Sequence, residues 1–329
     1  MTSPPAQMRA LVLTGFGGSE VFASTTVDVP TAGPRQLVVR VLGTSVNPLD
    51  YQTRRGDYRA ELTLPAIIGS DVSGVVAAVG PGVRDFAVGD EVFYLPPPFT
   101  GGSFAEFHAV DEAVAARKPR NLSHQEAGVL PCAGGTAWES LIERGRLRVG
   151  ETVLIHAAAG GVGSLAVQIA RAAGATVFAT CSERSRDFVA ALGPDRLIDY
   201  RAEDSVDVVR REAEGGGVDL IFDTVGGDTI ERSPYALRPG GRIVSIVDIP
   251  RPQSLLEAWN QNAELHFVFT PPRRATLDRL RVLLERGAVR PLIDSALPLE
   301  QAPAALERLE AGGVRGKIAL VPPGEPTAG

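Results

Sequence analysis

The run AAAGGVGS at residues 157–164 decides the fold of this 329-residue chain. It follows the apolar segment ETVLIHA, which is typical of a buried strand, and it leads into an amphipathic stretch that predicts a helix from about Gly161. Small residues at such a turn let backbone amides approach a pyrophosphate at the positive end of the helix. A tight turn without a ligand is the alternative for the bare motif, and the strand–turn–helix context favours a dinucleotide site. The residues expected to contact the dinucleotide in this turn are Ala158, Gly160, Gly161, Val162 and Gly163.

After Leu122 the chain alternates between buried strands and amphipathic helices. Strands separated by helices imply right-handed crossovers and a parallel, doubly wound sheet. From Arg9 to about Val114, by contrast, short β-rich runs are separated by Gly and Pro turns, which predicts an all-β, barrel-like unit. The stretch LPPPFTGG at residues 95–102 is expected to form an exposed loop.

The composition excludes several classes of protein. The 33 basic and 39 acidic residues give a net charge of -6 without a basic block, so nucleic acid is not an expected partner. Cys132 and Cys181 are the only cysteines, which excludes a four-cysteine zinc site and a disulfide framework. The start MTSPPAQMRA has no signal-peptide core and no stretch is apolar enough to span a membrane, so we expect a soluble, cytoplasmic protein.

The end of the second predicted strand, ATVFAT, bears on the choice of dinucleotide. It reaches Cys181 and Ser182, where an NAD site would place an acid on the ribose 2′-hydroxyl. Glu183 is close, but Arg184 and Arg186 flank it, and a guanidinium suits a 2′-phosphate that a carboxylate would repel. The pattern favours NADPH over NADH, with Arg184 the better candidate because it is nearer the strand end. A solvated first turn of helix is the alternative for both arginines.

Several motifs now form a recognisable set in a fixed order. They are NPLDYQTRRGDY (47–58), GSDVSGVVAAVGPGV (69–83), GSFAEF (102–107), LPCAGGTAWESL (130–141), AAAGGVG, LGPDRLIDY (192–200), DTVGG (223–227), LRPGGRIV (237–244) and RGKIAL (315–320). The chain resembles the zinc-independent quinone oxidoreductases and enoyl reductases of the medium-chain dehydrogenase superfamily. The resemblance covers nearly the whole sequence.

This resemblance implies an α/β protein made of a GroES-like β-barrel catalytic domain and a Rossmann domain with a doubly wound parallel sheet. The expected divisions are a catalytic domain over residues 1–124, an NADPH-binding domain over 125–270 and a C-terminal segment over 271–329 that returns to the catalytic domain. It also implies an active site in the cleft between the domains and a homodimer.

The resemblance also bears on metal binding. Zinc-dependent relatives hold the catalytic metal with a Cys, a His and a second Cys, at positions that here hold Asn47, Ser70 and Cys132. An amide and a hydroxyl are poor zinc ligands, and Asp71 is a further candidate ligand that we consider weak. Without a Lewis acid, alcohol oxidation loses its main catalytic device, whereas hydride delivery to a conjugated acceptor remains feasible. The histidines, which show no metal spacing, are His108, His124, His156 and His266.

The candidate catalytic residues lie in the segment that begins at Asn47. The resemblance implies that Asn47 lies beside the nicotinamide and the substrate, with Asp50 in the same NPLD segment; an Asx turn beside a proline is the alternative. Tyr58 matches a tyrosine that enoyl-thioester reductases use as a hydrogen-bond or proton donor to the developing enolate. Tyr51 and water are the competing donors.

The resemblance implies further cofactor contacts. Thr136 would offer its hydroxyl, Tyr200 would stack on adenine, and Gly226 with Ile246 would border the nicotinamide ribose. Lys317 matches a cofactor-proximal lysine, although a basic residue that heads a strand usually faces solvent. Phe267 and Phe269 alternate along a strand, where they line the acceptor cleft, pair across a dimer or pack in the core.

The function expected from these residues is NADPH-dependent transfer of a hydride to a quinone or to the activated C=C bond of an enone, without zinc. An enoyl-thioester reductase or a tailoring reductase of secondary metabolism is an alternative with the same chemistry and another acceptor. A non-catalytic NADPH-binding sensor is an alternative of a different class, since a fold does not fix a function.

Overall fold

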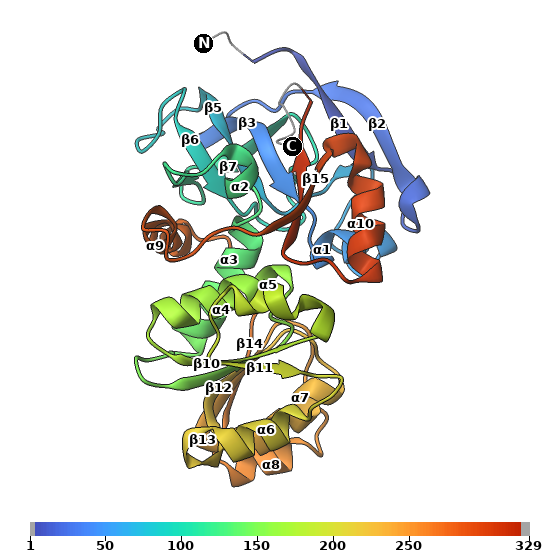
Figure 1. The fold of residues 1–329 in the computed structure, drawn as a ribbon. Coiled ribbons are helices and arrows are strands. Elements are labelled where there is room, and N and C mark those ends of the chain that lie inside the picture. Colours follow the sequence, from blue (N-terminus) through green and yellow to red (C-terminus); the bar gives the residue numbers. More distant parts are fainter. Residues whose placement is uncertain (1–3, 324–329) are drawn as a thin grey trace. The chain divides into compact units, whose positions relative to one another are not determined.

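A computed structural model describes residues 4–323 and divides the chain into two compact units (Figure 1). Unit 1 runs to Cys132 and also contains Pro271–Glu285 and the stretch from Pro291 onwards, and unit 2 comprises Ala133–Thr270 and Arg286–Arg290. The first boundary therefore lies later than residue 124, where the sequence analysis put it. The reason is that α2 (His124–Ala127) packs on unit 1: a Cβ added to Gly43 would lie 2.3 Å from the carbonyl oxygen of His124.

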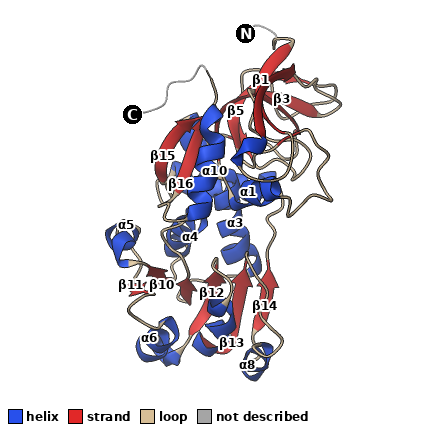
Figure 2. Cartoon of the chain, turned by 90° about the vertical axis from the view of Figure 1, so that its right-hand side faces the viewer, coloured by secondary structure: helices blue, strands red, loops and turns tan. Residues whose placement is uncertain are grey.

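Unit 2 is built on a six-stranded parallel sheet in the order β11-β10-β9-β12-β13-β14, which confirms the predicted doubly wound sheet. Its strands are β9 (Thr152–Ile155), β10 (Thr176–Cys181), β11 (Arg196–Asp199), β12 (Val218–Asp223), β13 (Leu237–Ser245) and β14 (Glu264–Phe267). Helices α4 (Gly161–Ala172) and α5 (Arg186–Ala190) lie on one face of the sheet, and α6 (Ser205–Glu212) and α8 (Leu255–Asn260) lie on the other (Figures 1 and 2). The unit also contains α7 (Asp228–Arg232).

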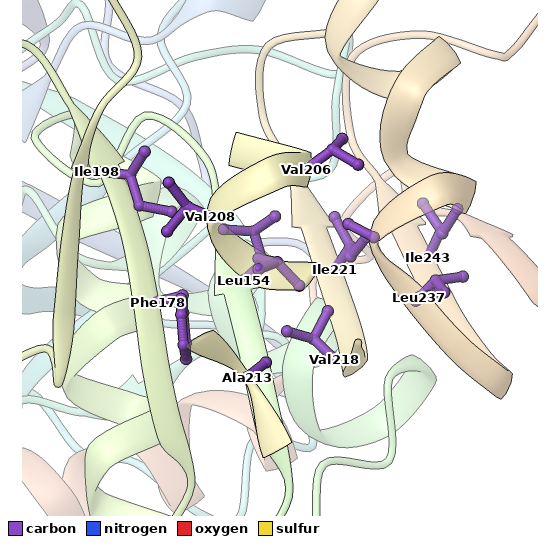
Figure 3. Packing of buried hydrophobic residues seen from close by; sticks show 12 residues of the cluster. Leu154, Phe178, Ile198, Val206, Val208, Ala213, Val218, Ile221, Leu237 and Ile243 are labelled. Carbon is purple, nitrogen blue, oxygen red and sulfur yellow. The ribbon is translucent and has the colours of Figure 1, made fainter. Parts of the chain in front are cut away.

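The core on the α6 side of this sheet shows why the strands line up as they do (Figure 3). The five strands from β9 to β13 each contribute a large apolar side chain to the same face, namely Leu154, Phe178, Ile198, Ile221 and Ile243. Leu154 stands opposite Phe178 on one side and Ile221 on the other, so the register itself brings these side chains together. Burial of each such side chain is worth about 1.5–3 kcal/mol. A slip of one residue would turn the whole row to the other face.

Unit 1 contains two sheets. The smaller has the strand order β2-β1-β4, and the larger has the order β15-β16-β3-β5-β6-β8 with β7 paired to β3. The strands are β1 (Gln7–Leu13), β2 (Phe22–Asp28), β3 (Gln36–Ser45), β4 (Ala66–Ile67), β5 (Val72–Val79), β6 (Glu91–Tyr94), β7 (Phe107–Asp111), β8 (Ala116–Arg117), β15 (Ile293–Pro298) and β16 (Lys317–Val321). The helices are α1 (Pro48–Arg55), α2, α9 (Arg274–Glu285) and α10 (Ala302–Ala311), while α3 (Pro131–Trp138) spans the boundary to unit 2.

The C-terminal segment belongs to unit 1 because it completes the core of that unit. Strand β16 pairs antiparallel with β3, with Ala319 opposite Ser45. Leu306 from α10 and Ile318 from β16 join a buried cluster that also contains Phe104. This pairing sets the first residue of β16 beside the end of β3, which is where the candidate site of unit 1 begins.

The stretch at residues 95–102 is a loop, as predicted, but it is only partly exposed. Leu95 and Gly102 are buried, and a Cβ added to Gly102 would lie 2.1 Å from the carbonyl carbon of Ile68. The expectation of an exposed loop was therefore wrong for the two ends of this stretch, because glycine and proline indicate the backbone path and not what covers it. No helix within residues 4–323 has the length and apolar character that a membrane span requires.

Candidate active site

The glycine-rich turn joins β9 to α4 at the carboxyl ends of the parallel strands. Gly160 is the N-cap of α4, and no side chain caps this helix. Gly161 and Val162, which open the helix, are half-buried, and Ala158 before them is fully buried. The backbone amides of the first turn of α4 are therefore available to bind a ligand, and the N-terminus of a helix favours an anionic ligand.

Gly163 explains why the turn can be this tight. A Cβ at Gly163 would lie 2.3 Å from the carbonyl oxygen of Ala157, so only glycine lets the helix approach the end of the strand this closely. Ala157 itself has a φ of 49°, and its N–H donates to the hydroxyl of Thr180 at 3.1 Å. The turn fits the pyrophosphate group of a dinucleotide, as its sequence predicts.

The end of β10 carries the residues expected to select the dinucleotide. Ser182 is buried, whereas Arg184 is exposed and has no hydrogen-bond or ion-pair partner within residues 4–323. Arg186 differs, because its guanidinium lies 3.5 Å from the carboxylate of Glu183. Tyr200 follows β11, and its N–H donates to the carbonyl of Cys181 at 3.2 Å, so its exposed ring belongs to the same edge of the sheet. The structure thus places Ser182, Arg184 and Tyr200 at one edge of the sheet, with the guanidinium of Arg201 5.7 Å from the centre of the Tyr200 ring.

The ends of β12 and β13 lie at this same edge. Asp223 accepts hydrogen bonds from the N–H of Gly226 at 3.0 Å and from the hydroxyl of Ser245 at 3.0 Å. Gly226 has a φ of 75°, which favours glycine, and Ile246 donates its N–H to the carbonyl of Asp223 at 3.3 Å. Gly226 and Ile246 therefore lie at the carboxyl ends of neighbouring strands, where an open α/β sheet binds its ligand.

Three further residues of unit 2 were predicted to contact the cofactor or to line the acceptor cleft, namely Thr136, Phe267 and Phe269. The hydroxyl of Thr136 is hydrogen-bonded to that of Thr270 at 2.5 Å. Phe267 and Phe269 are 53% and 61% exposed, so the alternative that they pack in the core is wrong.

In unit 1 the predicted residues meet in a buried polar network at the end of β3. The side-chain amide of Asn47 donates to Asp71 at 2.8 Å, and its oxygen accepts from the ammonium of Lys317 at 2.5 Å. Asp71 also accepts from the hydroxyl of Ser45 at 2.5 Å and from the backbone N–H of Cys132 at 2.7 Å. Lys317 therefore does not face solvent, contrary to the usual position of a basic residue at the head of a strand.

Asp50 closes a second branch of the network. Its carboxylate accepts the backbone N–H of Asn47 at 2.8 Å, across the first turn of α1, and the hydroxyl of Ser70 at 2.7 Å. Burial raises the pKa of Asp50 from 3.8 to about 7, and the hydrogen bonds from Ser70 and Asn47 oppose that rise. A carboxyl group with this pKa exchanges a proton near neutral pH, which suits acid–base chemistry.

The two candidate tyrosines occupy different surroundings. Tyr58 lies in the turn after α1, half-buried, with its ring 5.1 Å from that of Phe99, and its hydroxyl has no hydrogen bond to any residue between 4 and 323. Tyr51 packs against the apolar cluster of unit 1 with the guanidinium of Arg55 5.2 Å from its ring. Burial raises the pKa of Tyr51 above 10.0, which makes it a weaker proton donor than an ordinary phenol.

Zinc does not fit the donors of this network. The side chains of Asn47 and Ser70 are already hydrogen-bonded to Asp71 and Asp50, and an amide and an alcohol are poor zinc ligands. The ammonium of Lys317 lies 3.6 Å from Asp71, where it would repel a divalent cation. Across residues 4–323, no group of three or more His, Cys, Asp or Glu side chains could hold a metal ion.

Unit 2 also has a cavity of about 380 Å³ that the predicted site does not use. It is lined by Arg171, Leu192 and Arg290 among others, and none of its lining residues belongs to the glycine-rich turn at residues 157–164. Arg171 is held by Asp195 at 3.0 Å, and the side chain of Gln168 is tied to the backbone of Arg290 at 3.1 and 3.0 Å. The side chains of Arg171 and Gln168 therefore already have hydrogen-bond partners within the protein, and we do not assign a ligand to this cavity.

Sequence reasoning did not find that Lys317, Asp71 and Ser45 form one group. The motifs that contain them are far apart, and Lys317 lies 270 residues from Asn47. The available signal was the strand GKIALV, which needs a partner strand; its antiparallel pairing with β3 brings the lysine to Asn47.

Comparisons with known proteins agree with both units. A family model described as alcohol dehydrogenase GroES-like domain matches residues 33–120, and one described as zinc-binding dehydrogenase matches residues 192–320. The chain is 33% identical to the 2-methylene-furan-3-one reductase of Solanum lycopersicum, over 97% of this chain and 80% of that protein. It is 32% identical to the NADPH-dependent alkenal/one oxidoreductase, chloroplastic, of Arabidopsis thaliana, over 97% and 81%. The solved quinone oxidoreductase of Coxiella burnetii superposes with a TM-score of 0.88 at 32% identity, over 96% of this chain and 99% of that one.

Proposed function

This chain belongs to the medium-chain dehydrogenase/reductase superfamily and is an oxidoreductase, and we propose that it uses NADPH to reduce a quinone or the activated C=C bond of an enone without zinc. The observation that carries the proposal is the buried amide of Asn47, held between Asp71 and Lys317 where zinc-dependent relatives have a metal ligand. Such a centre has no Lewis acid to polarise an alcohol, but it can orient a conjugated acceptor by hydrogen bonds.

The cofactor would be held by unit 2. The uncapped amides at the start of α4 would bind the pyrophosphate, and the unpaired Arg184 at the end of β10 would bind a 2′-phosphate. Tyr200, exposed beside them, would cover the adenine. The absence of an acid at the tip of β10 supports NADPH over NADH, since Glu183 is turned to Arg186.

The residues of unit 1 would act on the acceptor. When bound, NADPH supplies a hydride, and a conjugated acceptor that receives it builds up negative charge on its oxygen. The phenol of Tyr58, which has no partner within the described residues, would donate a hydrogen bond or a proton to that oxygen. Asn47, fixed on both sides, would orient the acceptor through its remaining N–H.

We also propose that the protein is a homodimer. Strand β14 ends the order of the six-stranded sheet, so one side of its backbone is left without a partner strand among the described residues. Phe267 and Phe269 lie exposed on and just after this strand. A second copy that pairs its own β14 across a twofold axis would bury these rings and remove the open edge from both copies.

The test of the proposed function is NADPH oxidation, followed without oxygen, against a panel of quinones, enones and enoyl thioesters, with NADH in parallel. We expect turnover of a quinone or an enone, NADPH preferred, by protein that contains no zinc in elemental analysis. A preference for enoyl thioesters would show that the protein is an enoyl-thioester reductase. Cofactor binding without any turnover would instead support the non-catalytic sensor.

Reduction of the same acceptor also tests whether Tyr58 is the hydrogen-bond or proton donor. Tyr58→Phe should lower kcat by about 100-fold or more, as loss of a positioned donor does, while Tyr51→Phe leaves it nearly unchanged. Unchanged reduction by Tyr58→Phe would remove this residue from the mechanism.

A further inference from the structure

Lys317 is unusual in this chain both for its type and for its position. Of the 33 basic residues only Lys118 and Lys317 are lysines, and the other 31 are arginines. Lys317 is 7% exposed at the start of β16, although a buried ammonium is costly unless acceptors surround it. The groups around Lys317 must therefore compensate for the burial of its charge.

Three acceptors surround the ammonium. They are the carbonyl oxygen of Val46 at 2.9 Å, the side-chain oxygen of Asn47 at 2.5 Å and the carboxylate of Asp71 at 3.6 Å. An ammonium carries three donors on one compact charge, which matches this arrangement, whereas the planar fork of an arginine does not. The site thus accounts for a lysine in a chain that otherwise uses arginine.

The two neighbours of Asn47 leave its amide only one orientation. Lys317 can only donate hydrogen bonds and the Asp71 carboxylate can only accept them, so the amide oxygen must face Lys317 and the amide nitrogen must face Asp71. A flipped amide would set its N–H against the ammonium and its oxygen against the carboxylate. Two charge-assisted hydrogen bonds would then be replaced by two repulsive contacts.

We propose that Lys317 is a positioning residue, which together with Asp71 locks the side-chain amide of Asn47 in one orientation and so presents its second N–H and second lone pair in fixed directions. Each of those two groups has no hydrogen bond within residues 4–323. The fixed orientation is a property of the chain itself. Its value for hydride transfer rests on the proposed function, in which Asn47 contacts the acceptor.

The first test does not depend on activity. The chain has four asparagines, so labelling with ¹⁵N-asparagine gives four side-chain amide groups, and Asn47→Ala identifies the one of interest. In Lys317→Met we expect the Asn47 amide signals to shift and their hydrogens to exchange with solvent at least about 10-fold faster, because one of the two locks is removed. Asn121, whose amide donates to the carbonyl of Leu284, is the internal control and should not change. Unaltered Asn47 signals in folded Lys317→Met would overturn the proposal.

The second test is kinetic and asks whether Lys317 acts through Asn47. In single turnovers, Lys317→Met should slow hydride transfer by about 10- to 100-fold, the usual cost of a misoriented active-site group. In an Asn47→Ala background the same substitution should cost nothing more, because the residue it positions is gone. Multiplied losses in the double variant would contradict the proposal. Lys118→Met, which removes the other buried lysine, should leave hydride transfer unchanged.

Lys317→Gln separates positioning from general damage to the fold. A glutamine amide can still donate to Asn47 but carries no charge, so it should restore part of the hydride-transfer rate that Lys317→Met loses. It also replaces Lys317→Met in both tests if the latter does not fold. Should the protein reduce no acceptor at all, the proposed function fails, while the ¹⁵N spectra still decide whether Lys317 locks the amide.

Discussion

Replacement of Asp50 by asparagine should change how the stability of the protein depends on pH. In the folded protein, burial raises the pKa of this carboxyl from 3.8 to about 7. The folded state therefore binds a proton between these two pH values that the unfolded state has released, and the carboxyl group stabilises the fold less and less as the pH rises through this range. The amide in Asp50→Asn has no such proton, so the free energy of unfolding of this variant should not share the decline.

The size of the effect follows from the same shift. Each pH unit between the two pKa values is worth about 1.4 kcal/mol, so between pH 5 and pH 7 the variant should gain about 2–3 kcal/mol on the wild type. An asparagine can keep both contacts, because its oxygen can accept the N–H of Asn47 and its amide can donate to Ser70. The expected difference in the free energy of unfolding therefore comes from the proton that Asp50 binds and not from a lost hydrogen bond.

Urea unfolding from pH 5 to pH 8.5 measures this difference. Circular dichroism follows both units, whereas tryptophan fluorescence follows unit 2 alone, since Trp138 and Trp259 both lie there. Asp90→Asn is the matched control in unit 1. Partial burial raises the pKa of Asp90, but the hydrogen bonds from Arg117 and Ala87 outweigh it and lower the pKa, so the cost of Asp90→Asn should be constant above pH 5. A difference between Asp50→Asn and wild type that does not change with pH would refute the reasoning.

Three other predictions concern the remaining parts of the proposal. Arg184→Ala should raise KM for NADPH by about 10- to 100-fold and leave KM for NADH nearly unchanged, with Arg186→Ala as the control; equal effects on both cofactors would reject the 2′-phosphate contact. Gly163→Ala should destabilise unit 2 by about 1–3 kcal/mol in urea and weaken cofactor binding in titrations. Gly160→Ala, where the nearest atom is 3.4 Å from the added Cβ, should cost clearly less. Phe269→Glu should halve the mass found by sedimentation, and an unchanged mass would exclude β14 as the interface.

The fold could be predicted because its signals are local. The turn at 157–164 contains its own strand end, glycines and helix start, and α4 begins at Gly161 as expected. The alternation of strands and helices after it leaves few topologies other than a parallel sheet. The alignment of side chains such as Leu154 and Ile221 on one face of the sheet then follows from the register.

The features that the sequence missed depend on contacts between distant segments. The burial of Gly102 is set by the backbone of Ile68, and no property of the stretch LPPPFTGG indicates it. The alternative that Lys317 faces solvent was wrong, because the antiparallel pairing of β16 with β3 carries it to the buried side chain of Asn47. The motifs supplied the candidate residues, whereas the pairing of strands showed which of them are in contact.

Asp71 and Asp50, the two carboxylates of the buried polar network, differ because their surroundings differ. Asp71 lies 3.6 Å from the ammonium of Lys317 and accepts three hydrogen bonds from other groups, which makes it the counterion of that lysine. Asp50 accepts from one hydroxyl and one backbone N–H, both neutral, and its burial is not offset by a contacting cation. Near pH 7 the charge of the network therefore changes at Asp50, while the amide of Asn47 stays locked by the Lys317–Asp71 pair. A divalent cation bound beside Asp50 would favour the ionised form of its carboxyl group and so remove this uptake of a proton near pH 7.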